Sequence, residues 1–143
     1  MATPQQVIDA IQADIGALTG MRGAPHEAPE AINAYPFCVA YVESGRSWSD
    51  IPGAQIILCN IRLDLHVARK DMPRDIARAM PWLATILNAL HKPMATNTGD
   101  RFDSTVDAMG EISFTFGALD YGTNETIGFS FLIQDVKIQT NIT

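Results

Sequence analysis

The sequence predicts an α+β fold in which an antiparallel sheet of about four to five strands packs against two helices as a two-layer sandwich. Three patterns carry this prediction. Residues 111–137 alternate apolar and polar side chains on both sides of a turn at 122–124, which is typical of an antiparallel hairpin. Residues 56–67 repeat this alternation, and residues 3–18 and 73–91 place apolar side chains at helical spacing.

The first helix has a clear N-terminal signal. Thr3 is the expected N-cap, Pro4 takes the first helical position, and Gln6 completes a capping box. The apolar stripe that follows consists of Ile8, Ile11, Ile15 and Leu18. Residues 19–34 then form a connection containing Gly and Pro. It is longer than a compact domain usually needs between two elements, so we expect it to contribute to function.

Two strands with a loop between them follow. Residues 37–42 are apolar on both faces, which suits a strand that is covered on two sides. Residues 44–53 predict a mobile polar loop that carries Trp48. In the strand at 56–67, the apolar side chains are expected to point to the core and the polar ones to solvent.

The second helical region contains an interior proline. We expect Pro81 to split it into a short helix at 73–79 and a main helix at 81–91, because an interior proline loses a hydrogen bond and clashes with the preceding turn. Residues 98–100 predict a turn, and residues 102–108 predict a short strand before the final hairpin.

Length and composition favour one domain, residues 1–143, with a globular core. The net charge of −6 and the scattered Lys and Arg residues argue against a general nucleic-acid binder. Because the first residues have neither a positive leader nor an apolar core, we expect no secretory signal, and no apolar run approaches the ~20 residues that cross a bilayer. Cys38 and Cys59 are expected to be buried thiols in a reducing cytoplasm, although a disulfide between neighbouring strands stays an alternative.

No residue pattern predicts catalysis or a bound metal. Residues 26–30 superficially resemble a metal-binding helix motif, but Pro29 interrupts a helix there and Glu30 stands where a second His is needed. The sequence contains no glycine-rich phosphate loop, nucleophile elbow or Cys-x-x-Cys pair. We therefore expect a protein that is not an enzyme and that uses no cofactor or metal.

Arg62, Asp64 and His66 form a polar row on one face of the strand at 56–67. Such a row can support catalysis only with an oriented partner and a cleft that shifts the pKa of its groups. Because alternation produces a polar row on any half-exposed strand, a solvated face or an interface is the simpler expectation.

The chain resembles the tail terminator (tail completion) proteins of long-tailed bacteriophages, a family of small α+β subunits. The resemblance covers nearly the full length and rests on the order of the elements. These are the capped helix at 3–18, the Pro-led strand at 35–42, the long strand at 56–67, a helix ending at 83–90, and the hairpin at 111–137 with its Leu-Asp-Tyr-Gly sequence.

The resemblance implies a homohexameric ring that caps the tail tube protein and joins it to the head-side connector or stopper protein. Genomic DNA passes through the lumen without sequence-specific binding, and no membrane takes part. The ring would lie in the virion at the head–tail junction after assembly in the host cytoplasm. A ring needs two different patches on each subunit. The interface residues that we expect are Phe37, Tyr41, Arg46, Trp48, Arg62, Asp64 and His66.

Other functions stay open at this point. The chain could be another phage neck or head-completion protein of similar size. It could also be a small α+β domain that binds a ligand as a dimer through the face carrying Arg62, Asp64 and His66. A small enzyme that depends on His66 is the least supported alternative.

Overall fold

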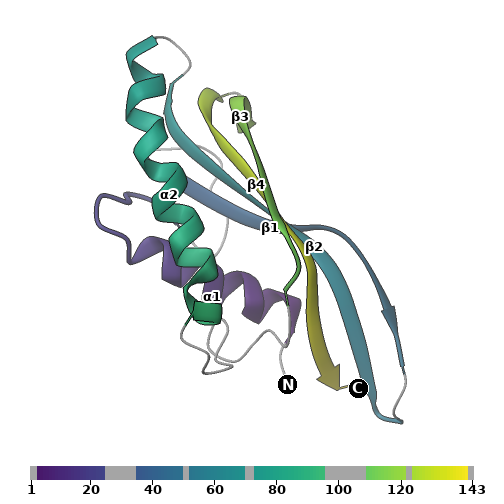
Figure 1. The fold of residues 1–143 in the computed structure, drawn as a ribbon. Helices are drawn as coiled ribbons and strands as arrows, with labels where there is room; N and C mark the ends of the chain where they lie inside the picture. The colour runs from purple at the N-terminus through teal and green to yellow at the C-terminus, as the bar shows by residue number, and fades with distance from the viewer. Residues whose placement is uncertain are drawn as a thin grey trace.

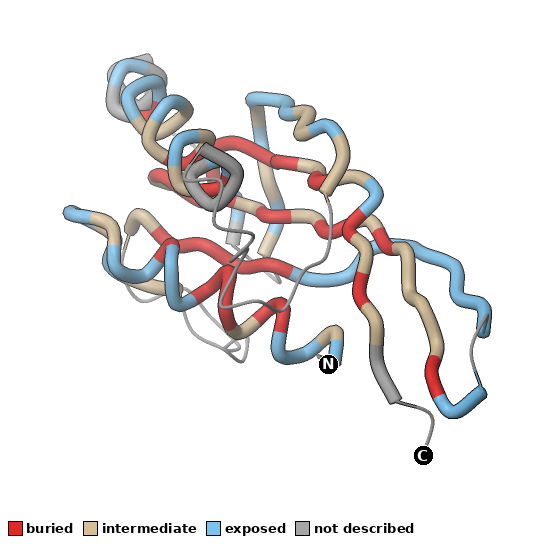
Figure 2. The backbone as a smooth tube through the Cα atoms, turned by 60° about the horizontal axis from the view of Figure 1, so that its bottom comes forward, coloured by how far each residue is buried: buried red, intermediate tan, exposed pale blue. Residues whose placement is uncertain are grey.

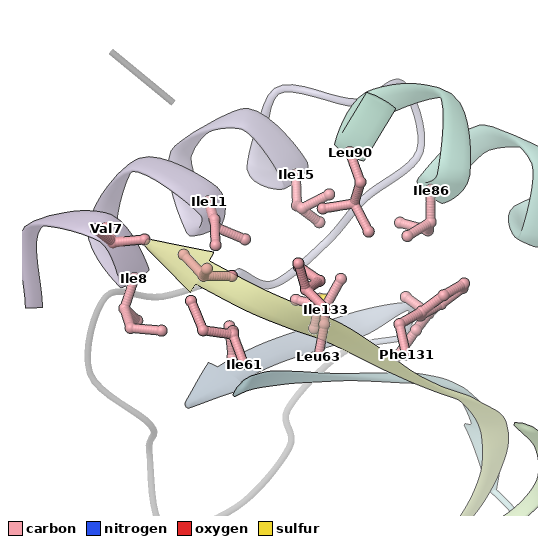
Figure 3. Packing of buried hydrophobic residues seen from close by; sticks show 14 of the residues in the cluster. Val7, Ile8, Ile11, Ile15, Ile61, Leu63, Ile86, Leu90, Phe131 and Ile133 are labelled. Atoms are coloured by element: carbon pink, nitrogen blue, oxygen red, sulfur yellow. The ribbon is translucent and has the colours of Figure 1, made fainter. Parts of the chain in front are cut away.

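The computed structural model describes residues 3–24, 35–49, 52–69, 73–95, 109–121 and 124–141. The elements in chain order are α1 (Pro4–Gly16), β1 (Phe37–Trp48), β2 (Ala54–Arg69), α2 (Pro73–Ala95), β3 (Ile112–Tyr121) and β4 (Asn124–Asn141). The strands form a four-stranded antiparallel sheet in the order β1-β2-β4-β3, and both helices lie on one face of it (Figures 1 and 3). The predicted α+β fold with two layers is confirmed.

Helix α1 begins with the predicted capping box. The hydroxyl of Thr3 accepts a bond from the backbone N–H of Gln6 at 3.3 Å, and Oε1 of Gln6 accepts one from the N–H of Thr3 at 2.9 Å. These bonds satisfy donors that a helix N-terminus otherwise leaves unpaired. The helix ends at Gly16, slightly earlier than the apolar pattern predicts.

Helix α2 is continuous, so the predicted split at Pro81 is wrong. Ala77 and Pro81 are both exposed, and water can therefore satisfy the carbonyl that loses its partner one turn before the proline. On the opposite side, Ile86 and Leu90 are fully buried against the sheet. Burial of this face outweighs the local cost of the proline, and the helix continues past Pro93 as well.

The hairpin of β1 and β2 is much longer than predicted. The first half of the expected loop at 44–53 is strand, because β1 continues to Trp48, which pairs with Ile56. A bulge at Glu43, between Val42 and Ser44, marks the point where this extension begins. Beyond the bulge every β1 residue is exposed, and Figure 2 shows the end of the strand in the exposed colour. We call β1 residues 44–48 together with β2 residues 54–59 the distal hairpin.

The core lies between the helices and the inner face of the sheet (Figure 3). Its largest fully buried side chains include Ile11, Ile15, Ile61, Leu63, Ile86, Leu90, Phe129, Phe131 and Ile133. Gly128 permits a close approach of β4 to β2, since a Cβ there would collide with the carbonyl oxygen of Leu65. Cys38 and Cys59 are buried free thiols, as expected, and burial raises the pKa of both.

Part of the long connection at 19–34 is described by the structure. Gly23 forms a parallel bridge with Phe37, and its carbonyl accepts a bond from the N–H of Cys38 at 2.7 Å, so residues 21–24 run beside the start of β1. The predicted turn at 98–100 and strand at 102–108 lie outside the described residues, as does most of the 122–124 turn.

Candidate subunit interface

Five of the expected interface residues lie together on the outer face of the sheet, opposite the helices. Phe37 pairs across the strands with His66, and Tyr41 pairs with Arg62. Asp64 lies between these pairs on β2, two residues from each neighbour in the row. The alternation within each strand predicts that these residues share a face. It does not predict which residue of β1 lies opposite which residue of β2, and that register is seen only in the folded sheet.

The polar members of this face form a network within the subunit. Arg62 makes two bonds to the carboxylate of Glu43, Nε to Oε1 at 3.0 Å and Nη2 to Oε2 at 3.1 Å. Its Nη1 donates to the hydroxyl of Ser130 at 2.8 Å, and that hydroxyl donates to Oδ1 of Asp64 at 2.7 Å. Burial, with Asp64 nearby, raises the pKa of Tyr41. The charges of Arg62 and Asp64 are thus already engaged, which leaves them poorly suited to bind a ligand.

His66 does not face solvent, so this part of the sequence prediction is wrong. Its side chain is 1% exposed and lies near the rings of Phe37 and Tyr121, with centroids 6.2 and 5.6 Å away. Nδ1 lies 2.6 Å from the hydroxyl of Thr126, which itself donates to the carbonyl of Leu119. Nδ1 must therefore carry the proton, because the hydroxyl has only one hydrogen to donate.

This arrangement makes His66 a neutral, structural side chain. Burial lowers its pKa, and the carboxylate of Asp64 opposes that shift only in part. Nε2 has no hydrogen-bond partner among the described residues. The burial of His66 depends on Phe37 and Tyr121, which come from other strands, and alternation along β2 could not have predicted it.

Arg46 and Trp48 lie on the distal hairpin, in a strand and not in the predicted loop. The guanidinium carbon of Arg46 is 5.2 Å from the centroid of the Trp48 ring, a cation–π contact. The register aligns Arg46 with Leu58 and then with Lys137 of β4, all on the outer face. Trp48 is 36% exposed. We call Arg46, Trp48 and Lys137 the distal patch.

A second exposed patch was missed by the sequence analysis. Phe114 and Phe116 of β3 fit the alternation of a core face, yet they are 46% and 37% exposed. They pair with the buried Phe131 and Phe129 on the helix side of the sheet, at its β3 edge. Helix α1 packs on β1 and α2 on β4 and β2, so β3 lies beyond the helices. We call Phe114 and Phe116 the β3 patch.

Among the described residues we find neither a metal site nor a helix that could span a membrane. No group of three His, Cys, Asp or Glu side chains among them could hold a metal ion. None of the described helices is long and apolar enough to cross a membrane. In comparisons with known proteins, no protein-family model matches the sequence and no curated protein matches it.

Proposed function

We propose that this protein is a structural subunit of a tailed-phage virion. It forms a hexameric ring that caps the tail tube, joins the tube to the head connector and lets DNA pass through its lumen. The resemblance of the sequence to tail terminator proteins suggests this function. The observation that carries it is that each subunit exposes two different apolar patches at opposite edges of one sheet.

A closed ring of more than two identical subunits needs such a pair of patches. In a heterologous interface, one surface of a subunit contacts a different surface of its neighbour. Strand β1 is one edge of the sheet and exposes Tyr41, Val42 and Trp48. Strand β3 is the other edge and exposes Phe114 and Phe116. Large exposed aromatic side chains are typical anchors of protein interfaces.

The charge of the chain is consistent with DNA passing through a ring without binding to it. Six copies, each of net charge −6, give a ring of charge −36. An acidic lumen repels the phosphate backbone, so DNA can slide without forming the contacts that slow its passage.

Among the alternatives, the dimeric ligand-binding domain has no observation in its favour. Its proposed site used Arg62, Asp64 and His66. The first two already bond to Glu43 and Ser130, and His66 is buried. Another neck protein of the phage is the remaining alternative, and it would also form a ring. A binding experiment distinguishes the two functions, because a tail terminator binds the end of a tail tube and the other neck protein binds the head connector.

Native mass spectrometry at high protein concentration, with negative-stain images of the same sample, tests the proposal. We expect a six-copy species of about 94 kDa, from six chains of 15.6 kDa, and annular particles. A stable dimer, or a monomer at every concentration and in the presence of tail tubes, would contradict it.

A further inference from the structure

We propose that neighbouring copies of this chain contact each other head to tail through complementary charges. The distal patch of one copy would bind an acidic surface, next to the β3 patch, on the following copy. The inference rests on the proposed ring and names the two surfaces that build it. It commits to a second copy of this chain as the occupant of both surfaces.

The distal patch concentrates positive charge on an acidic protein. Arg46 and Lys137 flank Leu58 on the outer face of three neighbouring strands, with Trp48 two residues along β1. In the described part of the chain, neither cation has a carboxylate partner. Two cations beside a half-exposed tryptophan therefore remain available to a partner with negative charge and an apolar centre.

The matching surface lies at the end of the β3–β4 hairpin. Asp120 and Glu125 are direct cross-strand partners and both are exposed. Like charges directly opposite each other on a sheet destabilise it, and none of the Lys or Arg side chains that the structure describes forms a salt bridge with this pair. The register places both carboxylates on the same face as Phe116, so we call Asp120 and Glu125 the acidic patch.

The positions of the two surfaces favour a head-to-tail contact. Figure 1 shows the distal end of β1 and β2 at one end of the sheet, and the end of β3 with the start of β4 at the opposite end. A two-fold symmetric dimer through either surface would place cations against cations or carboxylates against carboxylates. A head-to-tail contact joins opposite charges and pairs Trp48 with the rings of Phe114 and Phe116, which gives an aromatic centre with a charged rim.

Charge reversal tests this contact directly. Three variants are made: Arg46→Glu with Lys137→Glu, Asp120→Lys with Glu125→Lys, and a quadruple variant that carries all four changes. We expect each double variant to lower the hexamer fraction at least tenfold in native mass spectrometry. The quadruple variant restores opposite charges at every interface and should recover most of the hexamer. The wild-type hexamer should also weaken as salt is raised, because salt screens exposed charges.

Matched controls reverse exposed charges outside both surfaces, Arg22→Glu and Glu111→Lys, and should keep the wild-type hexamer. Circular dichroism of every variant checks that the fold is retained. If rings form but the double variants assemble normally, or the quadruple variant stays dissociated although folded, this contact is wrong while the proposed function stands. A wild type that forms no ring at any concentration, alone or with tail tubes, would overturn both proposals.

Discussion

The sheet has two regions that differ in what covers them. Where β2 and β4 run under the helices, the inner face is buried and contains the large core side chains, among them Leu63 and Phe131. In the distal hairpin, the β1 residues are exposed, and Arg46 stacks on the ring of Trp48. The first region has the burial that stabilises a monomer, whereas the second has large side chains whose burial would require a partner.

The largest expected effect comes from a pair of phenylalanines that face each other where the covered strand β4 meets the edge strand β3. Phe131 is fully buried, and its direct partner Phe114 is 46% exposed. Phe131→Ala should lower the free energy of unfolding by about 3–5 kcal/mol, because it leaves a cavity in the core. Phe114→Ala should cost no more than about 1 kcal/mol. Urea unfolding measured by tryptophan fluorescence compares the two, and equal losses would show that the β3 edge belongs to the core.

The predictions from the sequence succeeded where a structural signal is local. The capping box at Thr3 and Gln6 depends on residues three positions apart, and the core face of β2 follows from its own alternation. The β1 strand of the distal hairpin was missed because Ser44, Arg46 and Ser47 are polar on both faces of that strand, whereas most of its β2 strand lies in the predicted strand at 56–67. A strand without a buried face has no alternation to detect.

The candidate site was predicted in part, for the same physical reason. The shared face of Arg62, Asp64 and His66 is a property of one strand and was found. The burial of His66 and the exposure of Phe114 depend on which strands become neighbours and which strand becomes the edge. Strand order is decided by contacts between distant segments, and no pattern within a strand encodes it.

A smaller effect is expected when the pH is lowered. It depends on His66, which is buried on the outer face of the sheet, and it therefore measures how much this face contributes to the free energy of unfolding. The pKa of His66 is lowered in the folded state, so the unfolded chain takes up a proton near its ordinary pKa of about 6.5 while the folded chain does not. The free energy of unfolding should therefore fall as pH drops below about 6.5, by at most about 1.4 kcal/mol per pH unit from this group. Above that pH, His66 should contribute no slope.

Urea unfolding between pH 7.5 and 5 measures this slope for the wild type, for His66→Gln and for His91→Gln. His91 is exposed on α2 and serves as the matched control. The slope should decrease in His66→Gln, even though this variant is less stable overall, and persist in His91→Gln. An unchanged slope in His66→Gln would assign the pH dependence to other groups.

The smallest effect on stability is expected from Trp48, and it sharpens the comparison most because the chain has a second tryptophan with the opposite role. Trp48 is 36% exposed on the distal hairpin and stacks with Arg46, so Trp48→Ala should cost about 1 kcal/mol or less. Trp82 packs against the core from α2, and Trp82→Ala should lower the free energy of unfolding by about 2 kcal/mol or more.

Thermal unfolding of the monomers and native mass spectrometry of concentrated samples distinguish the two roles. Trp48→Ala should lose the hexamer with little change in stability, and Trp82→Ala should show the reverse. If Trp48→Ala instead unfolded the monomer, the distal hairpin would be part of the stabilising core, and its exposed side chains would no longer argue for a partner.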